Sequence, residues 1–224
     1  MARLPPDAVS LPGDLAPLLE HSVLRPEAAE ADVCLACAEA RELRLGAVCV
    51  RPRWVATAAG SLSGSGVRIV AVVDFPDGGG TAEERAREAR AVVAAGADEI
   101  DVVLSLALLR SRDYAAIVRD IAGVVSAGVP VKVILETSLL SRDEKVIAAA
   151  LAKAAGAASV KTSTGFAGGG ATEEDVRLLR EVVGPEFGVK ASGGIRSAGE
   201  ALRMVRSGAD RIGTSASKEI LRGS

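Results

Sequence analysis

The repeating unit of this chain is clearest in the segment Gly156-Ala157-Ala158-Ser159-Val160-Lys161-Thr162-Ser163-Thr164-Gly165-Phe166. Glycine commonly ends a helix, because it adopts the left-handed backbone conformation without a steric penalty. The run 159–163 centres on Val160 and Thr162, which are β-branched and favour a strand, and Gly165 follows it. The segment therefore predicts a helix that ends at Gly156 and a short strand directly after it.

The same pattern of a glycine followed by a buried-looking strand recurs along the chain. Including the segment above, strands are predicted at 47–50, 67–73, 99–104, 131–136, 159–163, 189–192 and 211–214. The stretches between them are helical, and several begin with a capping-box pattern such as Thr81-Ala82-Glu83-Glu84 or Ser141-Arg142-Asp143-Glu144. The chain is therefore predicted to alternate strand and helix throughout.

This alternation predicts the fold class, an α/β TIM (β/α)8 barrel with a short N-terminal helix. That helix is expected from about residue 15, and a weaker eighth strand is expected at 21–24. The strands are almost continuously apolar, as in a parallel sheet covered on both faces, and eight βα units of 20 to 32 residues suit a barrel. The alternative is a doubly wound open sheet, but no dinucleotide-binding glycine pattern follows the first strand.

The length and composition of the chain limit the number of domains and the kinds of partner that are expected. The chain has 224 residues, 49% hydrophobic content and a net charge of −2, which fits one barrel domain spanning 1–224. That charge gives no basic field for nucleic acid, and no apolar run is long enough to span a membrane. Residues 1–7 lack an apolar signal core, so a cytoplasmic location is expected. Cys34 and Cys37 are interpreted as core packing.

Lysine is used selectively in this sequence. The chain contains twenty-one arginines and only six lysines, yet Lys132, Lys161 and Lys190 lie inside predicted strands, where lysine is unusual. Arginine stays protonated, whereas a desolvated lysine beside another cation loses its proton more readily. A neutral lysine amine can add to a carbonyl group and form a Schiff base. The placement therefore indicates Schiff-base chemistry.

The alternation of side chains along a strand predicts which charges meet. Asp101, Lys132, Lys161 and Lys190 are expected to point into the barrel, with Glu136 on the same face as Lys132. Lys161 would be the nucleophile, and the positive charge of Lys190 would favour its neutral form. Asp101, together with Lys132, would transfer protons. The alternative is a buried ion-pair network with only a structural role.

Two glycine-rich loops predict a phosphate site. They follow the seventh and eighth strands, and the first leads into a capped helix, which is the usual phosphate-binding arrangement of TIM barrels. The candidate contacts are Gly165, Gly193, Gly194, Ile195, Arg196, Gly213 and Ser215. The alternative is that these glycines only turn the chain. Cys49 ends the second strand and is placed at the barrel mouth or in its packing. His21 is the only histidine, so no metal site is predicted.

Five motifs resemble those of the deoxyribose-phosphate aldolase family, and together they cover almost the whole chain. They are Glu20-His21-Ser22-Val23-Leu24-Arg25-Pro26, Asp98-Glu99-Ile100-Asp101, Lys132-Val133-Ile134-Leu135-Glu136-Thr137, Val160-Lys161-Thr162-Ser163-Thr164-Gly165-Phe166 and Val189-Lys190-Ala191-Ser192-Gly193-Gly194-Ile195-Arg196. The two motifs that contain Lys161 and Lys190 are highly specific in combination.

The resemblance implies a class I aldolase that reversibly cleaves 2-deoxy-D-ribose 5-phosphate to D-glyceraldehyde 3-phosphate and acetaldehyde. It implies a Schiff-base lysine at Lys161, an assisting lysine at Lys190 and a proton-relay carboxylate at Asp101. It also implies a cytoplasmic homodimer with no metal or organic cofactor. The alternatives are another Schiff-base or phosphate-binding barrel enzyme acting on a different sugar phosphate, and a catalytically silent barrel that binds a sugar phosphate.

Some positions depart from the family pattern. Glu20-His21-Ser22 replaces aspartate-histidine-threonine. Asp74 stands where glycine normally precedes phenylalanine-proline, and its carboxylate is expected near the barrel mouth, where it would alter substrate access. Ala216 and Lys218 stand in the region where the family continues with serine and glycine, so one phosphate contact is expected to differ. The tail 221–224 lacks a tyrosine found in some members and is assigned no role.

Overall fold

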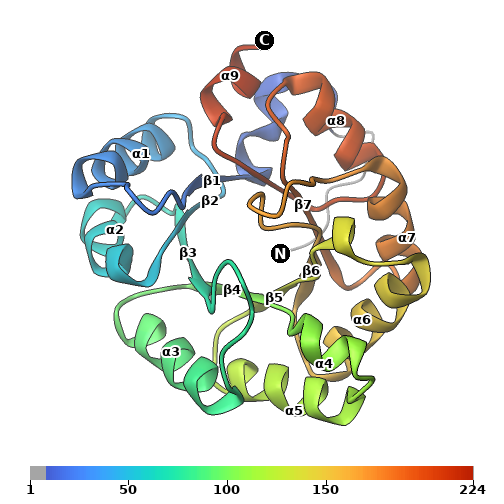
Figure 1. Cartoon of the computed structure of the whole chain (residues 1–224). Helices are drawn as coiled ribbons and strands as arrows, with labels where there is room; N and C mark the ends of the chain where they lie inside the picture. Colours follow the sequence, from blue (N-terminus) through green and yellow to red (C-terminus); the bar gives the residue numbers. More distant parts are fainter. Residues whose placement is uncertain (1–8, 224) are drawn as a thin grey trace.

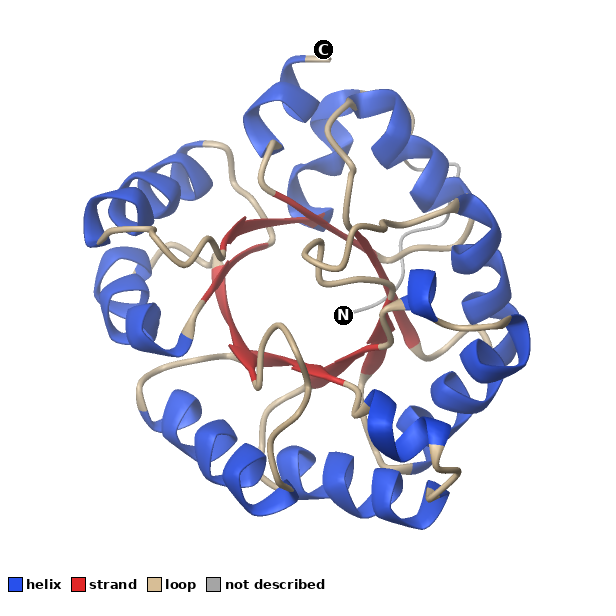
Figure 2. Ribbon diagram, viewed as in Figure 1, coloured by secondary structure: helices blue, strands red, loops and turns tan. Residues whose placement is uncertain are grey.

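The architecture is a closed barrel of eight parallel strands (Figure 2). The computed structural model describes residues 9–223, so the prediction made on residues 1–7 lies outside the described part of the chain. The strands are β1 (Leu19–Val23), β2 (Ala47–Val50), β3 (Arg68–Val73), β4 (Glu99–Val103), β5 (Val131–Ile134), β6 (Ser159–Lys161), β7 (Gly188–Ser192) and β8 (Arg211–Thr214). Each strand pairs with the next, and β8 pairs with β1. The TIM barrel is confirmed and the open doubly wound sheet is excluded.

Helices form a ring outside the barrel (Figure 1). They are α1 (Glu30–Glu42), α2 (Val55–Leu62), α3 (Ala82–Ala94), α4 (Leu106–Arg110), α5 (Tyr114–Val125), α6 (Arg142–Ala154), α7 (Glu173–Val183), α8 (Ala198–Arg206) and α9 (Ser217–Arg222), with 3-10 helices η2 (Pro12–Leu18), η3 (Pro52–Trp54) and η4 (Thr137–Leu139). The side chains of Thr81 and Ser141 accept hydrogen bonds from the third backbone N–H of their helices. The predicted capping boxes therefore do begin α3 and α6.

The start of the described chain differs from the prediction. The helix expected from about residue 15 is the 3-10 helix η2, which contains Pro12 and Pro17. A proline inside an α-helix lacks the N–H that the next turn requires, so a tighter and shorter helix forms here. As a result β1 begins at Leu19, two residues before the predicted strand, and Glu20 becomes part of the barrel.

The two faces of the strands have different environments. Outward side chains such as Ile100, Val160 and Val189 belong to the main apolar core between the barrel and the helices. Inside the barrel, a separate apolar cluster covers the β1 to β3 side. It consists of Leu24, Ala47, Cys49, Val70 and Val72, with Phe75 packed against it. The rest of the interior is charged: it holds the buried charged residues of β4 to β7, together with Glu20 of β1.

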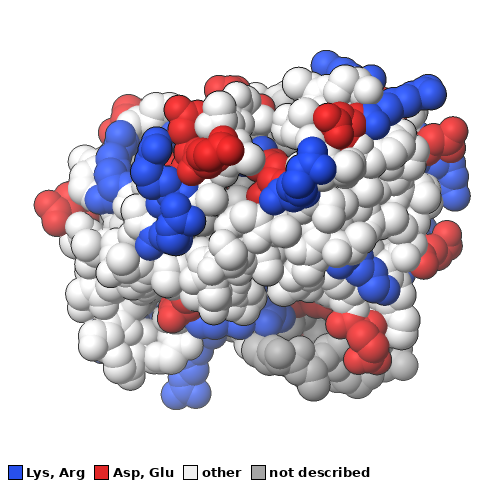
Figure 3. Space-filling view, turned by 90° about the horizontal axis from the view of Figure 1, so that it is seen from below, with Lys and Arg blue, Asp and Glu red and all other residues white. Residues whose placement is uncertain are grey.

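The distribution of charged side chains on the surface can be compared with the net charge of −2. Figure 3 shows basic and acidic side chains intermixed over the face in view. Within residues 9–223, no helix is both long enough and apolar enough to cross a membrane.

Cys37 is buried as predicted, but Cys34 is exposed, so the interpretation of Cys34 as core packing was wrong.

Candidate active site

Three lysines surround one carboxylate in the barrel interior. Asp101 on β4 accepts hydrogen bonds from Lys132 Nζ on β5 at 3.1 Å and from Lys161 Nζ on β6 at 2.9 Å. Lys190 Nζ on β7 donates to the same oxygen as Lys161, Oδ2, at 2.8 Å. The strand register places Asp101 opposite Lys132 and Lys161 opposite Lys190. The alternation of side chains thus brings together the four residues named from the sequence.

The cluster is buried, and its charges stabilise one another. Burial alone would raise the pKa of Asp101, but the positive charges of Lys132, Lys161 and Lys190 hold it well below the usual range. Burial alone would lower the pKa of Lys190, but Asp101 and Glu20 raise it well above its ordinary value. At neutral pH, Asp101 is therefore ionised and Lys190 is protonated.

Glu20 is a member of the cluster that the sequence analysis missed. Its carboxylate is fully buried and pairs with Lys190 Nζ, and it lies 3.7 Å from Lys132 Nζ. Burial would raise the pKa of Glu20, but the charges of Lys132 and Lys190 lower it. The sequence pattern could have placed Glu20 inside the barrel, because it alternates with the apolar residues Leu19 and Val23 in β1. The predicted strand began one residue too late to include it.

Lys132 is held by Asp101 and also from the opposite end of the barrel. Its Nζ lies 2.5 Å from a carboxylate oxygen of Glu99, and Glu99 in turn lies 2.6 Å from Arg68. Lys132 also lies behind the cleft rather than on its wall, since it is not among the lining residues. A direct contact between Lys132 and a substrate in the cleft is therefore not supported by its position.

Glu136 was expected on the same inward face as Lys132, and this prediction was wrong. β5 ends at Ile134, and Glu136 has a φ of 56°, in the left-handed region. The alternation of faces stops with the strand, so the side chain takes a different direction. Its carboxylate accepts a hydrogen bond from the backbone N–H of Thr164 at 3.0 Å, in the loop after β6.

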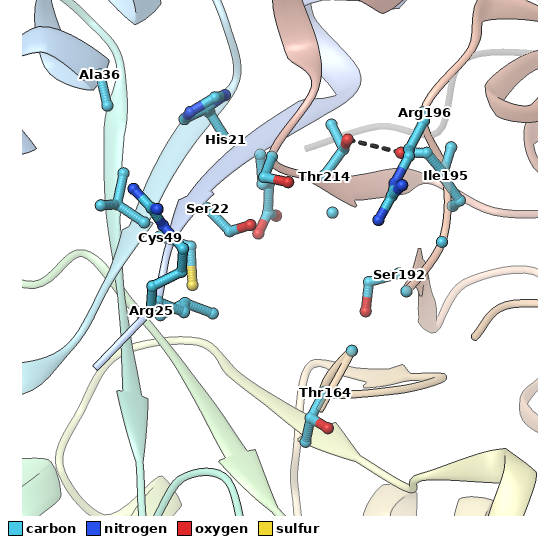
Figure 4. Close-up of a pocket in the computed structure, with 18 of the residues that line it drawn as sticks. His21, Ser22, Arg25, Ala36, Cys49, Thr164, Ser192, Ile195, Arg196 and Thr214 are labelled. Atoms are coloured by element: carbon cyan, nitrogen blue, oxygen red, sulfur yellow. Dashed lines mark hydrogen bonds between the residues drawn. The ribbon is translucent and has the colours of Figure 1, made fainter. Parts of the chain in front are cut away.

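A cleft of about 500 Å³ opens over this cluster at the carboxyl ends of the strands. Lys161 and Lys190 line it, whereas Asp101 lies behind them. The other predicted residues that line it are Cys49, Gly165, Gly193, Gly194, Ile195, Arg196, Gly213 and Ser215. In Figure 4, Cys49 lies on one side of the cleft, and Ser192 and Arg196 lie on the other. The structure thus gathers the candidate lysines and the glycine-rich loops around one cavity.

The two glycine-rich loops are tied together at the rim of the cleft. Thr214, the last residue of β8, donates through its Oγ1 to the carbonyl oxygen of Ile195 after β7, at 2.7 Å (Figure 4). Gly193 and Gly194 have φ values of 95° and 80°, which favour glycine at both positions. The glycines therefore do turn the chain, and their backbone also borders the cavity.

The start of α8 contributes less to an anion site than the sequence indicated. The carboxylate of Glu200 accepts hydrogen bonds from the backbone N–H groups of Arg196 and Ser197, at 2.8 and 3.0 Å. Those two N–H groups are therefore occupied by the capping box. The groups that remain available to an anion are the Arg196 side chain, the Ser215 hydroxyl and the backbone of the glycine-rich loops.

Three of the departures from the family pattern, Asp74, Ala216 and Lys218, do not line the cleft. Asp74 does not line it: its carboxylate accepts a hydrogen bond from the Gly80 N–H at 3.0 Å and lies 3.5 Å from Arg85. Asp74 therefore does not border the cleft directly, and its effect on substrate access stays a prediction. Lys218 pairs with Glu39 of α1 at 2.8 Å, and the Ala216 N–H donates to Thr214.

Cys49 lies in the cleft wall as a protonated thiol. Burial, followed by the negative charge of Asp101, raises its pKa to about 11. It packs with Leu24 and Val72 on the apolar side of the barrel interior. Both sequence interpretations therefore apply, because Cys49 reaches the barrel mouth and also packs as a small apolar residue.

Comparison with known proteins gives consistent matches. The model of a family described as DeoC/LacD family aldolase matches residues 16–220. Deoxyribose-phosphate aldolase from Clostridium perfringens strain 13 is 48% identical over 212 residues, 93% of this chain and 95% of the relative. The enzyme of that name from Desulfitobacterium hafniense strain DCB-2 is 47% identical over 93% of this chain and 97% of the relative.

Solved structures agree with the sequence matches. A putative deoxyribose-phosphate aldolase from Coccidioides immitis superposes with a TM-score of 0.93 at 37% identity, covering 98% of this chain and 88% of the other. The tetrameric deoxyribose phosphate aldolase from Aeropyrum pernix gives a TM-score of 0.90 at 36% identity, covering 96% and 93%.

Proposed function

The chain belongs to the DeoC/LacD family of aldolases, and on this basis we propose that it is a deoxyribose-phosphate aldolase. It reversibly cleaves 2-deoxy-D-ribose 5-phosphate to D-glyceraldehyde 3-phosphate and acetaldehyde. The observation that carries the proposal is the position of Lys161, whose amine borders the cleft and contacts the Asp101 carboxylate at 2.9 Å. Such a lysine is a suitable nucleophile for an aldehyde.

The reaction begins at the amine of Lys161. The neutral amine adds to the C1 aldehyde of the open-chain sugar, and loss of water gives an iminium ion. The C2–C3 bond then breaks, with its electrons moving into an enamine on Lys161, while the C3 hydroxyl loses its proton and becomes the aldehyde of glyceraldehyde 3-phosphate. Protonation of the enamine at C2 and hydrolysis of the iminium release acetaldehyde and free Lys161.

Lys190 and Asp101 act as one unit with Lys161. Lys190 is held protonated by Asp101 and Glu20. Because Lys190 and Lys161 share Oδ2 of Asp101, that carboxylate is not available to Lys161 alone. Lys190 thus places a fixed positive charge beside Lys161, and Asp101 relays protons during water loss and hydrolysis. Lys132, which does not line the cleft, donates a hydrogen bond to Oδ1 of Asp101.

Trapping the intermediate tests the nucleophile. Borohydride reduction in the presence of acetaldehyde is expected to add a reduced two-carbon unit to Lys161, located by peptide mass spectrometry. Lys161→Arg is the matched control and should give no adduct, because arginine stays protonated. An adduct on Lys190 would refute the assignment of Lys161, and no adduct on the parent would favour the catalytically silent barrel.

The 5-phosphate is proposed to bind between the loops after β6, β7 and β8, near Gly165, Gly193, Gly194, Ile195, Arg196, Gly213 and Ser215. A charge-assisted contact contributes about 1.5 to 3 kcal/mol, so kcat/KM should be at least about tenfold higher for 2-deoxyribose 5-phosphate than for 2-deoxyribose. Arg196→Gln should reduce this preference, and Arg206→Gln, at the far end of α8, should not. Equal values for the two sugars would count against the site and favour another substrate.

We also propose that residues 1–224 form one domain that works as a homodimer in the cytoplasm without a metal or organic cofactor, as the family resemblance implies. Light scattering of the purified protein tests the oligomer, and a tetramer, as described for the relative from Aeropyrum pernix, would overturn it. Activity should survive extensive dialysis against EDTA. Cell fractionation tests the location.

A further inference from the structure

Glu136 combines two features that are unfavourable for a glutamate. It is only 4% exposed, and its φ of 56° lies in the left-handed region, which glycine and asparagine tolerate better. A buried carboxylate in a strained backbone position requires contacts that hold it there. Glu136 does not line the cleft, so contact with substrate is not its role.

Within residues 9–223, the side-chain hydrogen bonds of Glu136 go to the turn that follows Lys161. One oxygen, Oε2, accepts hydrogen bonds from the backbone N–H of Thr164 at 3.0 Å and from the Thr164 hydroxyl. The same hydroxyl oxygen accepts a hydrogen bond from the backbone N–H of Phe166 at 3.0 Å. A single carboxylate oxygen therefore fixes the turn 164–166 through three linked hydrogen bonds.

This turn forms part of the cleft wall. Thr164, Gly165 and Phe166 line the cleft together with Lys161, and in Figure 1 the loop between β6 and α7 reaches over the end of the barrel. The ring of Phe166 packs edge-on against Phe75, with the ring centroids 5.3 Å apart. Any displacement of the turn would therefore move Gly165 and Phe166 relative to Lys161.

The loop is fixed separately at its other end. The N–H of Ala171 donates to the carbonyl oxygen of Gly193 at 3.0 Å, and a Cβ on Gly170 would lie 2.4 Å from that same oxygen. That contact anchors the loop to the β7–α8 loop. At the end nearer Lys161, two side chains anchor the loop: Glu136 holds Thr164, and the Ser192 hydroxyl donates to the carbonyl oxygen of Ser163 at 2.5 Å.

We infer that Glu136 is a positioning residue, which holds the turn 164–166 so that Gly165 and Phe166 shape the phosphate-proximal wall beside Lys161. The inference extends the proposed function and rests on it for its kinetic consequence. The second oxygen, Oε1, is buried without a hydrogen-bond partner in the described part of the chain. The role therefore needs one acceptor oxygen rather than a full negative charge.

That distinction defines the variants. Glu136→Gln keeps one carbonyl oxygen that can accept from Thr164, whereas Glu136→Ala keeps none. Thr164→Val retains the shape of the side chain but loses the hydroxyl that links Glu136 to Phe166. Glu84→Ala is the matched control, because Glu84 makes the same carboxylate contacts to a threonine N–H and hydroxyl, both at 2.9 Å, at the start of α3 away from the cleft.

The kinetic readout is the separation of KM from kcat. In Glu136→Ala, KM for 2-deoxyribose 5-phosphate should rise about tenfold while kcat changes by less than about threefold. Glu136→Gln should stay near the parent, Thr164→Val should resemble Glu136→Ala, and Glu84→Ala should keep the parent KM. An unchanged KM in Glu136→Ala, or a Gln variant as impaired as the Ala variant, would overturn the inference.

A second readout does not depend on activity. Amide hydrogen exchange of a peptide that covers 162–168 should be faster in Glu136→Ala than in the parent and nearly unchanged in Glu136→Gln. Equal exchange in all three proteins would overturn the inference even if the variants fold less well. Hydrogen exchange therefore tests the role of Glu136 independently of catalysis. Failure of the parent to form an adduct with acetaldehyde would count against the proposed function and not against this role.

Discussion

A Cβ atom on Gly213 would lie 2.9 Å from Cε of Lys190. Gly213 in β8 is paired with Ser192, and the aliphatic part of the Lys190 side chain lies against its bare backbone. Any side chain at this position would occupy the space that Lys190 needs to reach Asp101. Gly213 was predicted as a phosphate contact, and the structure adds a second reason for glycine at this position.

The same added Cβ would lie 2.8 Å from Cβ of Ser192, so Gly213→Ala should impair catalysis by displacing Lys190, Ser192 or both. We expect kcat to fall about tenfold or more, because a shift of about 1 Å in a reacting group has effects of this size. Gly199→Ala is the control, since its added Cβ would meet only the flexible end of Arg203, at 3.5 Å. Steady-state kinetics with circular dichroism checks the prediction. A fully active Gly213→Ala enzyme would show that Lys190 has room to move.

Removing the charge of Lys190 should shift the pH dependence of iminium formation. In Lys190→Leu, Oδ2 of Asp101 contacts Lys161 alone, and the positive charge beside Lys161 is lost. The acidic limb of iminium formation should therefore move to higher pH, because a carboxylate partner favours a charged amine and a neighbouring cation disfavours it. Lys190→Arg keeps the charge and should leave the limb nearer its original position. The trapped adduct, measured against pH, provides the test; an unmoved limb in Lys190→Leu would assign Lys190 to proton donation or substrate contact instead.

Asp101→Asn should destabilise the fold at neutral pH. It removes the carboxylate shared by three buried lysines, and breaking a buried ion pair costs about 3 kcal/mol or more. The folded-state pKa of Asp101 lies below its unfolded value of 3.8, so its stabilising effect is complete above that pH and is lost as the pH falls further. Urea unfolding at pH 7 and at pH 3 should thus show a larger difference between parent and variant at pH 7. A constant difference would contradict the depressed pKa.

The three cysteines should differ in alkylation rate. Burial is the main cause that raises the pKa of both Cys37 and Cys49 to about 11, so at pH 8 only about one part in a thousand of each is thiolate. Cys34 is exposed. A time course with iodoacetamide, followed by peptide mass spectrometry, should find Cys34 modified first, and all three modified at similar rates in denaturant. Rapid modification of Cys49 in the folded protein would contradict the protonated thiol.

The regular part of the fold could be predicted from local pattern. The strands predicted at 47–50 and 211–214 match Ala47–Val50 and Arg211–Thr214, because a glycine before each and apolar residues within each mark both ends. The inward direction of Asp101, Lys161 and Lys190 followed from alternation alone. These features depend on neighbours in sequence, which a single chain displays directly.

The sequence is less informative for residues just after the end of a strand, where no sequence pattern marks that end. Glu136 adopts a left-handed conformation although it is not glycine, so alternation was continued past the end of β5. Asp74 directly follows β3, but its carboxylate contacts Arg85 of α3, so it does not line the cleft. Both residues are directed by tertiary contacts, which override the pattern of the strand.

Barrel closure has a consequence for when the protein becomes active. Glu20 is in the first strand and Lys190 in the seventh, and Lys190 Nζ contacts Glu20 and Asp101 together. β8 must lie between β7 and β1 for this to occur, so a nascent chain on the ribosome that has not yet produced β8 cannot complete the cluster. Until then, several charges of the future interior lack their partners and remain hydrated. The appearance of aldolase activity during refolding or synthesis should therefore report the docking of the last strand on the first, rather than the formation of any earlier βα unit.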